Sequence, residues 1–274
     1  MRWRLQREVS RLRAVHRQRV ERHGDAPLAP PLTPGEVSPA VLPQAIHGFQ
    51  QLLETEYESV VIAAWMSAAL ARLGAPLDLV GAFAKVVEDE VRHVDLVAQM
   101  LEALGAEPTL PQAPLPPRAE LAAGREALVE VLSGLMGFFC VGEELSAHIF
   151  KAALGVAQHP RAKWLVGEIF RDEAMHGPFG FEAARILLAE VDEAGRQRLE
   201  QRVVDEITRL EQRLGGPLQG PPREDFSAEE KELAGLGLLP KEALLQIFYD
   251  RVERSVLPRL AEIGLPIHLA SGGR

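Results

Sequence analysis

Apolar residues recur at helical spacing through most of the chain from Gln44 onward. They fall three and four residues apart, which marks one face of a helix, and no strand-like alternation is seen. Breakers rich in Gly and Pro, such as 74-GAP-76 and 158-QHP-160, separate these segments. We therefore expect an all-α fold with four long helices at its centre. The pattern predicts helices over 44–73, 77–104, 120–157, 161–190, 196–214 and 240–263, with Pro258 bending or shortening the last.

The N-terminal region differs from the rest of the chain. Its first 22 residues carry eight Arg and two Glu along a rough apolar stripe, which indicates a basic surface helix. A Pro-rich stretch over 24–43 follows and reads as a linker. The predicted organisation is a basic helix with linker over 1–43, a helical bundle over 44–190 and a C-terminal helical extension over 191–274.

Composition narrows the classes of protein to consider. The 274 residues are 47% hydrophobic and 25% charged, which is enough for a substantial core, and the net charge of -9 argues against general nucleic-acid binding. Cys140 is the single cysteine, so an internal disulfide and a four-cysteine metal site are excluded. No apolar run approaches the ~20 residues of a membrane span, and the N-terminus lacks a signal peptide. We expect a cytoplasmic protein without a membrane partner.

A charged motif occurs twice inside apolar helical segments. The stretches 89-DEVRH-93 and 172-DEAMH-176 align at an offset of 83 residues, and an apolar pair precedes each of them. Because residues i and i+3 share a helix face, the Glu and His of each copy point the same way, toward the apolar side. A carboxylate and an imidazole on an apolar face are costly unless a metal ion compensates them. The ligands predicted from the two motifs are Glu90, His93, Glu173 and His176.

Two further glutamates are expected on the helices that precede the motifs, level with them across the connecting turns. In the first half this position favours Glu58, which has apolar residues at i+4 and i+7; Glu54 is the alternative, and Glu56 is assigned to another face. In the second half Glu143 has apolar neighbours on its face, whereas Glu144 lies on a more polar one and is the alternative. Four carboxylates and two imidazoles suit two iron ions, a Mn/Fe pair or two manganese ions better than structural zinc.

This pattern of Glu, Asp-Glu-x-x-His, Glu and Asp-Glu-x-x-His resembles the ferritin-like di-iron carboxylate superfamily over about residues 44–190. The resemblance implies an antiparallel four-helix bundle. It also implies that Asp89 supports His176 and that Asp172 supports His93, each by accepting a hydrogen bond from the nitrogen that does not bind metal. The first motif carries Arg92, as many such motifs do, whereas the second has Met175 at that place.

The expected function is that of an oxidoreductase which uses two metal ions and O2 to oxidise a small organic substrate. Electrons would come from a separate reductase or ferredoxin, because the chain has no cysteine-rich relay; a homodimer is compatible with this function. The alternative is a ferroxidase or iron-handling protein without an organic substrate. A helical scaffold with a degenerate site is a third interpretation, which the intact ligand set disfavours. His148 is an alternative ligand, with a polar supporting or surface role as the simpler explanation.

Overall fold

The computed structural model describes residues 29–111, 125–218, 223 and 225–269, and no β-strand forms within these ranges. The predicted all-α class is confirmed for this part of the chain. None of the helices described there is both long and apolar enough to cross a membrane. The elements are the 3₁₀-helix η1 (Pro34–Glu36), α2 (Leu42–Arg72), α3 (Leu77–Ala103), α4 (Arg125–Gly134), the π-helix η2 (Leu135–Glu143), α5 (Glu144–Val156), α6 (Pro160–Leu188), α7 (Glu193–Arg213), α8 (Ala228–Gly235), α9 (Lys241–Arg251), the π-helix η3 (Val252–Val256) and α10 (Leu257–Glu262).

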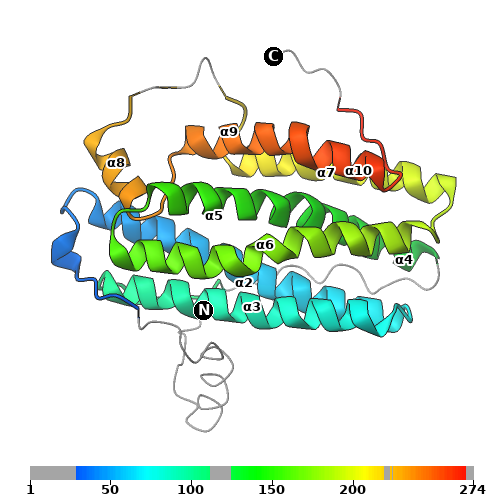
Figure 1. Cartoon of the computed structure of the whole chain (residues 1–274), viewed down its shortest axis with the longest axis horizontal. Helices are drawn as coiled ribbons and strands as arrows, with labels where there is room; N and C mark the ends of the chain where they lie inside the picture. Colours follow the sequence, from blue (N-terminus) through cyan, green and yellow to red (C-terminus); the bar gives the residue numbers. More distant parts are fainter. Residues whose placement is uncertain (1–28, 112–124, 219–222, 224, 270–274) are drawn as a thin grey trace, which may run out of the picture.

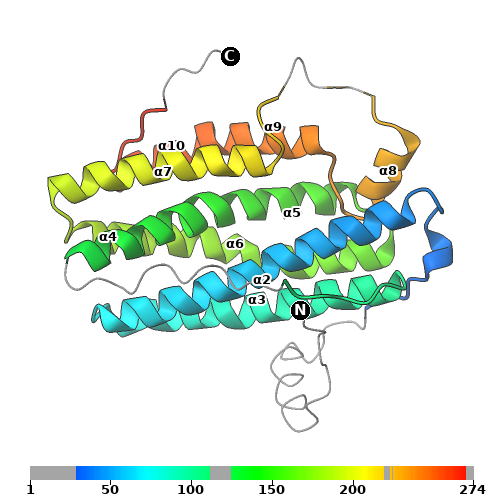
Figure 2. The ribbon, with the colours of Figure 1, turned by 180° about the vertical axis from the view of Figure 1, so that it is seen from behind.

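Four long helical runs lie side by side along the molecule (Figures 1 and 2). Helix α2 packs on α3, and α6 packs on the run formed by α4, η2 and α5. Contacts between α3 and α6 and between α2 and α4 join these two pairs. Helix α7 lies against α4 and η2, and α9 lies against α5, so the C-terminal part covers one side of the second pair (Figure 1).

The predicted helices agree with those observed to within a few residues at the ends that the structure describes. Local signals account for several ends: Pro160 occupies the first turn of α6, where its missing N–H costs nothing. The Asp192 side chain accepts a hydrogen bond from the Gly195 N–H at 2.9 Å and caps α7. The basic N-terminal helix and the start of the segment predicted at 120 lie outside the described residues. The division into three domains stays a prediction.

Three features of the helices were not predicted. Helix α8 was missed, although Ser227 and Glu230 form a capping box at its start. The segment predicted over 120–157 contains the π-helix η2, and the one over 240–263 contains η3. Pro258 lies in the first turn of α10, directly after η3. A proline has no N–H to donate to the preceding helix turn. The wider turn of η3 accommodates Pro258, so the helical run continues from α9 into α10.

The apolar core is divided into two parts along the helices. One part contains Met66 of α2 and Phe83 of α3, and the other contains Phe49 of α2 and Val97 of α3. On α2 and α3 the buried charged residues fall between the segments that contribute to the two parts, and on α6 Glu173 and His176 do the same. The fold therefore holds a buried polar layer in the middle of the helices, with apolar packing on either side.

Two glycines of α6 let it approach the neighbouring run closely at this layer. A side-chain carbon added at Gly180 would lie 2.5 Å from Cβ of Phe139 and 2.9 Å from its carbonyl carbon. One added at Gly177 would lie 3.3 Å from Cα of Glu144. Because these contacts are with backbone or Cβ atoms, they cannot be relieved by turning a flexible side chain. The absence of side chains at both positions brings α6 against the junction of η2 and α5.

Candidate metal centre

Two overlapping groups of buried side chains form the polar layer. In each group, one possible ligand atom from every residue lies within 4.8 Å of those of the others. Glu90 and Glu173 belong to both groups, so their carboxylates lie between the two positions. The groups are Glu56, Glu90, His93 and Glu173, and Glu90, Glu143, Glu173 and His176.

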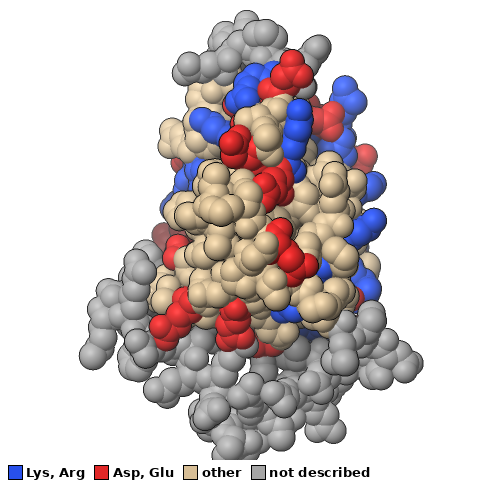
Figure 3. Space-filling model, turned by 90° about the vertical axis from the view of Figure 1, so that its left-hand side faces the viewer, with Lys and Arg blue, Asp and Glu red and all other residues tan. Residues whose placement is uncertain are grey.

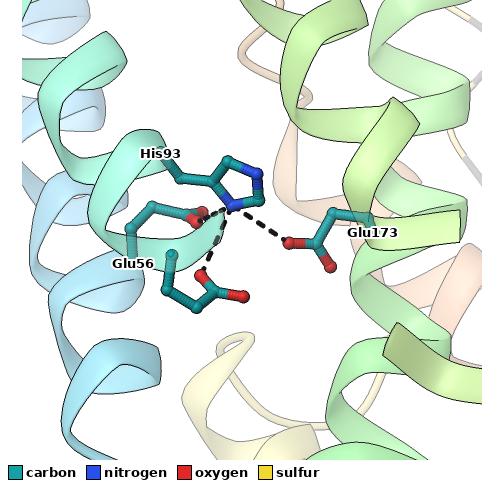
Figure 4. Close-up of side chains that lie close together, drawn as sticks. Glu56, His93 and Glu173 are labelled. Carbon is teal, nitrogen blue, oxygen red and sulfur yellow. Dashed lines mark hydrogen bonds and ion pairs between the residues drawn. The ribbon is translucent and has the colours of Figure 1, made fainter. Parts of the chain in front are cut away.

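The first group surrounds one ring nitrogen of His93. Its Nδ1 atom lies 3.2 Å from Oε2 of Glu56, 3.4 Å from Oε2 of Glu90 and 3.5 Å from Oε1 of Glu173. Figure 4 shows the Glu56 and Glu173 carboxyl groups reaching this nitrogen from opposite sides, one from α2 and the other from α6. Oxygen and nitrogen donors thus converge from three helices on one small volume.

The second group repeats this arrangement around His176. Its Nδ1 atom lies 3.1 Å from Oε1 of Glu90, 3.5 Å from Oε2 of Glu143 and 3.8 Å from Oε1 of Glu173. The ring centroids of His93 and His176 are 6.1 Å apart. Glu90 directs a different oxygen at each imidazole, so its carboxylate would be available to both metal positions.

Several atoms of the cluster are buried without a hydrogen-bond partner. They are both carboxylate oxygens of Glu90, Oε2 of Glu173 and Nδ1 of His176. A buried polar atom left unsatisfied costs about 1–3 kcal/mol, and more if it is charged. All of them belong to groups that bind metals through these atoms. The residues present therefore fit a pair of metal ions, which would satisfy the unpaired atoms together.

The outer nitrogen of each imidazole meets an aspartate from the other motif. Nε2 of His93 lies 3.2 Å from Oδ2 of Asp172, and Nε2 of His176 lies 3.4 Å from Oδ2 of Asp89. These are the cross-helix pairs that the resemblance implied. Each aspartate fixes the ring orientation and the tautomer that leaves Nδ1 facing the cluster.

A network of buried side chains holds Asp172, and the motif spacing alone does not predict it. Arg92 is buried and donates to Oδ2 of Asp172 at 2.9 Å, and it also donates to the carboxylate of Glu168. In the other half, Asp89 pairs with Lys85, whose side chain is 57% exposed. An 83-residue offset aligns Lys85 with Glu168 and Arg92 with Met175. The two copies of the motif therefore have the same residues at the cluster, but different side chains support their aspartates.

The ionisation of the cluster reflects its burial. Burial raises the pKa of Glu56 to about 7, and burial together with the charges of Glu143 and Glu90 raises that of Glu173 well above its ordinary range. Burial alone would lower the pKa of His93, but the neighbouring carboxylates raise it well above the usual value. Without metal, the cluster thus neutralises itself with protons. Binding of cations would displace these protons.

The structure corrects the assignment of Glu58 to the cluster. Glu58 belongs to neither group, and its Oε2 atom pairs with Nη2 of Arg213 on α7 at 2.8 Å. Glu56, which was assigned to another face, is 3% exposed and lies in the cluster. The large apolar residues at i+4 and i+7 from Glu58 favoured the prediction that it lies on the core face of the helix. The buried stripe of α2 instead runs through Leu53, Glu56 and Ala63, and its small residues near Glu56 leave room for the carboxylates.

Three alternative ligands also lie outside the cluster. Glu54 is exposed and accepts a hydrogen bond from Gln50. Glu144 is buried but accepts hydrogen bonds from Ser255 at 2.6 Å and Arg259 at 2.7 Å. His148 contacts the backbone oxygen of Glu144 and a guanidinium nitrogen of Arg251.

The π-helix η2 ends at Glu143, immediately before these groups. Such segments change the rotational register of a helix and are frequent at functional sites. Here Glu143 faces the metal cluster, whereas its neighbour Glu144 faces the C-terminal helices. Both adjacent carboxylates are therefore buried, each with its own set of partners.

A cavity of about 950 Å³ adjoins the cluster. Glu56, Glu143 and Glu173 contribute to its wall. The rest is lined by α2, the η2–α5 run, α7, α8, the segment 237–240 and α9. This volume lies within the range of ligand-binding cavities. The arrangement can therefore bring a small molecule close to the carboxylates of the candidate centre.

Together these features define an all-helical protein with a buried carboxylate–imidazole centre suited to metal ions. No protein-family model matches the chain, and comparison with curated proteins also finds no match.

Proposed function

We propose that the protein is a ferritin-like, di-metal carboxylate oxidoreductase that uses O2 to oxidise a small organic substrate. The native metals in this proposal are two iron ions, with a Mn/Fe or di-manganese pair as variants of the same chemistry. The observation that carries the proposal is the buried set of four carboxylates and two imidazoles, which leaves cluster atoms unpaired and adjoins a cavity.

The choice of metal follows from the donor atoms. Carboxylate oxygens with imidazole nitrogens suit iron or manganese, and four carboxylates balance the charge of two divalent cations. Four-helix di-iron proteins have a ligand set with one Glu from each of two helices and a Glu-x-x-His motif from each of the other two. In this chain Glu56 and Glu143 supply the first pair, and the two repeated motifs supply the second.

The bound metals would transfer electrons to dioxygen and so activate it for substrate oxidation. The protein's own contribution is to position the groups around that chemistry. Asp89 and Asp172 orient the two imidazoles, and apolar packing lies on either side of the layer that contains them. Since Cys140 is the single cysteine, a separate reductase or ferredoxin supplies the electrons in this proposal.

Metal analysis and oxygen consumption test this function directly. We expect two iron or manganese ions per chain in protein purified from cells, and O2 consumption by the reduced protein that increases with substrate. Glu90→Gln should lose the metals, because Glu90 belongs to both groups. Glu182→Gln makes the same chemical change in an exposed ion pair of α6 and should keep them. Metal-free wild-type protein, or full metal content in Glu90→Gln, would contradict the proposal.

A ferroxidase or iron-handling role is the second candidate, and the cavity wall gives it support. Four glutamates outside the cluster, Glu54, Glu58, Glu206 and Glu230, line the cavity that leads to it. Acidic residues along such a path attract cations, as an access route for Fe²⁺ requires. Assembly into a large shell that stores iron mineral would favour this role. A small assembly that consumes O2 only with an organic substrate would exclude it.

A further inference from the structure

The cavity beside the cluster has a mainly apolar wall. The helices that enclose it expose half-buried aliphatic and aromatic side chains to its interior, in addition to fully buried ones. Half-buried apolar residues gathered in a concave surface indicate binding of an apolar ligand. Those that define the wall are Leu52, Phe138, Ile149, Leu210, Leu238 and Leu244.

The charged groups of the wall are unevenly balanced. Arg209 and Arg213 are the only lysine or arginine residues among the described lining residues, against seven glutamates. Both arginines already have carboxylate partners: Arg213 pairs with Glu58 across the cavity wall at 2.8 Å, and Arg209 donates from Nε to Glu206 at 3.0 Å. An anionic ligand would have to break one of these pairs and would then face the remaining glutamates.

The surface around this end of the molecule has the same character. Figure 3 shows acidic side chains running through the middle of the face that carries α8, with basic ones gathered toward its upper part and one edge. Glu230 of α8 and Gln44 and His47 near the start of α2 line the cavity from this end. The field here thus favours approach of neutral or positively charged molecules over anions.

We propose that this cavity binds an uncharged or cationic, mainly apolar substrate and selects against anions such as carboxylates. The inference rests on the proposed function, because it names the class of substrate for the same centre. The apolar part of the substrate lies between α2 and α5, and the reacting carbon lies beside Glu56, Glu143 and Glu173. Glu58 is a specificity-determining residue, since it occupies Arg213 and keeps that guanidinium from an anion.

Three ligands with the same alkyl chain test this selectivity: 1-decanol, decyltrimethylammonium and decanoate. Their displacement of the neutral apolar dye N-phenyl-1-naphthylamine is measured with the full-length protein as purified and again after chelation of metals. We expect decanol and decyltrimethylammonium to displace the dye and decanoate to bind up to about fivefold more weakly, since it must break an ion pair. Tightest binding by decanoate, or no displacement by any ligand, would overturn the proposal.

Single-residue variants test whether the ligands bind in this cavity and whether Glu58 determines the selectivity. Glu58→Gln frees Arg213 and should strengthen decanoate binding up to about fivefold. Glu182→Gln breaks an ion pair of α6 outside the cavity wall and should not change it. Ile149→Trp should fill the cavity and reduce decanol binding. Ile186→Trp, at a half-buried residue of α6 outside the cavity wall, should leave it unchanged. Unaltered binding in both Glu58→Gln and Ile149→Trp would overturn the assignment of the site.

The two proposals fail in different ways in these experiments. Ligand selectivity is measured with and without metals, so it does not depend on oxygen chemistry. Selective binding by a protein that holds no iron or manganese would remove the oxidoreductase function and keep the cavity assignment. A protein that contains the metals and consumes O2, but from which no ligand displaces the dye, would keep the oxidoreductase function and remove the cavity assignment.

Discussion

Replacing Glu56 by Gln should change the stability of the metal-free and metal-loaded protein in opposite directions. Gln has the shape of a neutral carboxylic acid, and its amide oxygen can still accept a hydrogen bond from Nδ1 of His93, which lies 3.2 Å from Glu56. It cannot carry the negative charge that a metal ligand needs. The variant thus removes a buried charge when the centre is empty of metal and removes a ligand when metal is supplied.

The magnitude follows from the pKa of Glu56, which burial raises from an ordinary value of 4.5 to about 7. The folded protein holds this proton more tightly than the unfolded chain, so wild-type stability falls as pH rises from 4.5 to 7 and then levels off. This rise in pKa corresponds to about 3 kcal/mol. Glu56→Gln has no proton to release at this position, so its stability does not fall in this way as pH rises. At pH 8 the metal-free variant should therefore be more stable than wild type by up to ~3 kcal/mol, or roughly 6–12 °C in Tm.

Thermal unfolding without Fe²⁺ and with Fe²⁺ under anaerobic conditions measures the stability of the metal-free and the metal-loaded protein. Metal at about 100 times its Kd should stabilise wild type by ~2.7 kcal/mol, and Glu56→Gln should gain much less. Glu58→Gln is the matched control on the same helix: it loses an ion pair worth at most about 1 kcal/mol and keeps the full response to metal. A metal-free Glu56→Gln protein that is less stable than wild type at pH 8, or one that responds fully to metal, would refute this reasoning.

Three other outcomes test the site and the packing around it. Metal affinity should rise with pH, by about tenfold between pH 6 and 8 from the proton on Glu56 alone; titration with Mn²⁺ measures this, and a pH-independent affinity would contradict it. Asp172→Asn should weaken metal binding by about 10–100-fold in the same titration while the protein stays folded, because a neutral amide replaces the carboxylate that orients His93; unchanged affinity would contradict that role. Gly180→Ala should lower the free energy of unfolding by about 1–3 kcal/mol in denaturant titrations, whereas Gly81→Ala, which meets nothing within 4 Å, should not lower it.

Helical periodicity was sufficient to predict most of the fold. The long helices could be read from the sequence because each carries a continuous apolar face and is bounded by Gly and Pro. Helix α8 escaped this approach because it has only eight residues, none of them buried, so it lacks an apolar stripe. The π-helices escaped it too, since a single extra residue in a turn leaves the average spacing of apolar positions almost unchanged.

The candidate site was predictable where two residues of one motif constrain each other, and less so where a ligand stands alone. Glu90 and His93 are tied by their i, i+3 spacing, so one apolar face placed both. A lone glutamate on α2 has no such partner, and the choice of Glu58 followed the largest apolar neighbours. A heptad-like reading through Phe49, Leu53 and Glu56, which continues to Ala63, would have favoured the residue that the structure brings into the cluster.

The supporting groups show why the paired motifs alone do not describe the site. His93 is held through Asp172 by a buried arginine, whereas the aspartate of His176 is paired with a largely exposed lysine. Water screens the lysine pair and hardly reaches the arginine pair, so the two imidazoles differ in how firmly they are held. Two positions with the same ligands thus have unequal supports. Such a difference would give two metal ions unequal affinities and let one position exchange more readily than the other.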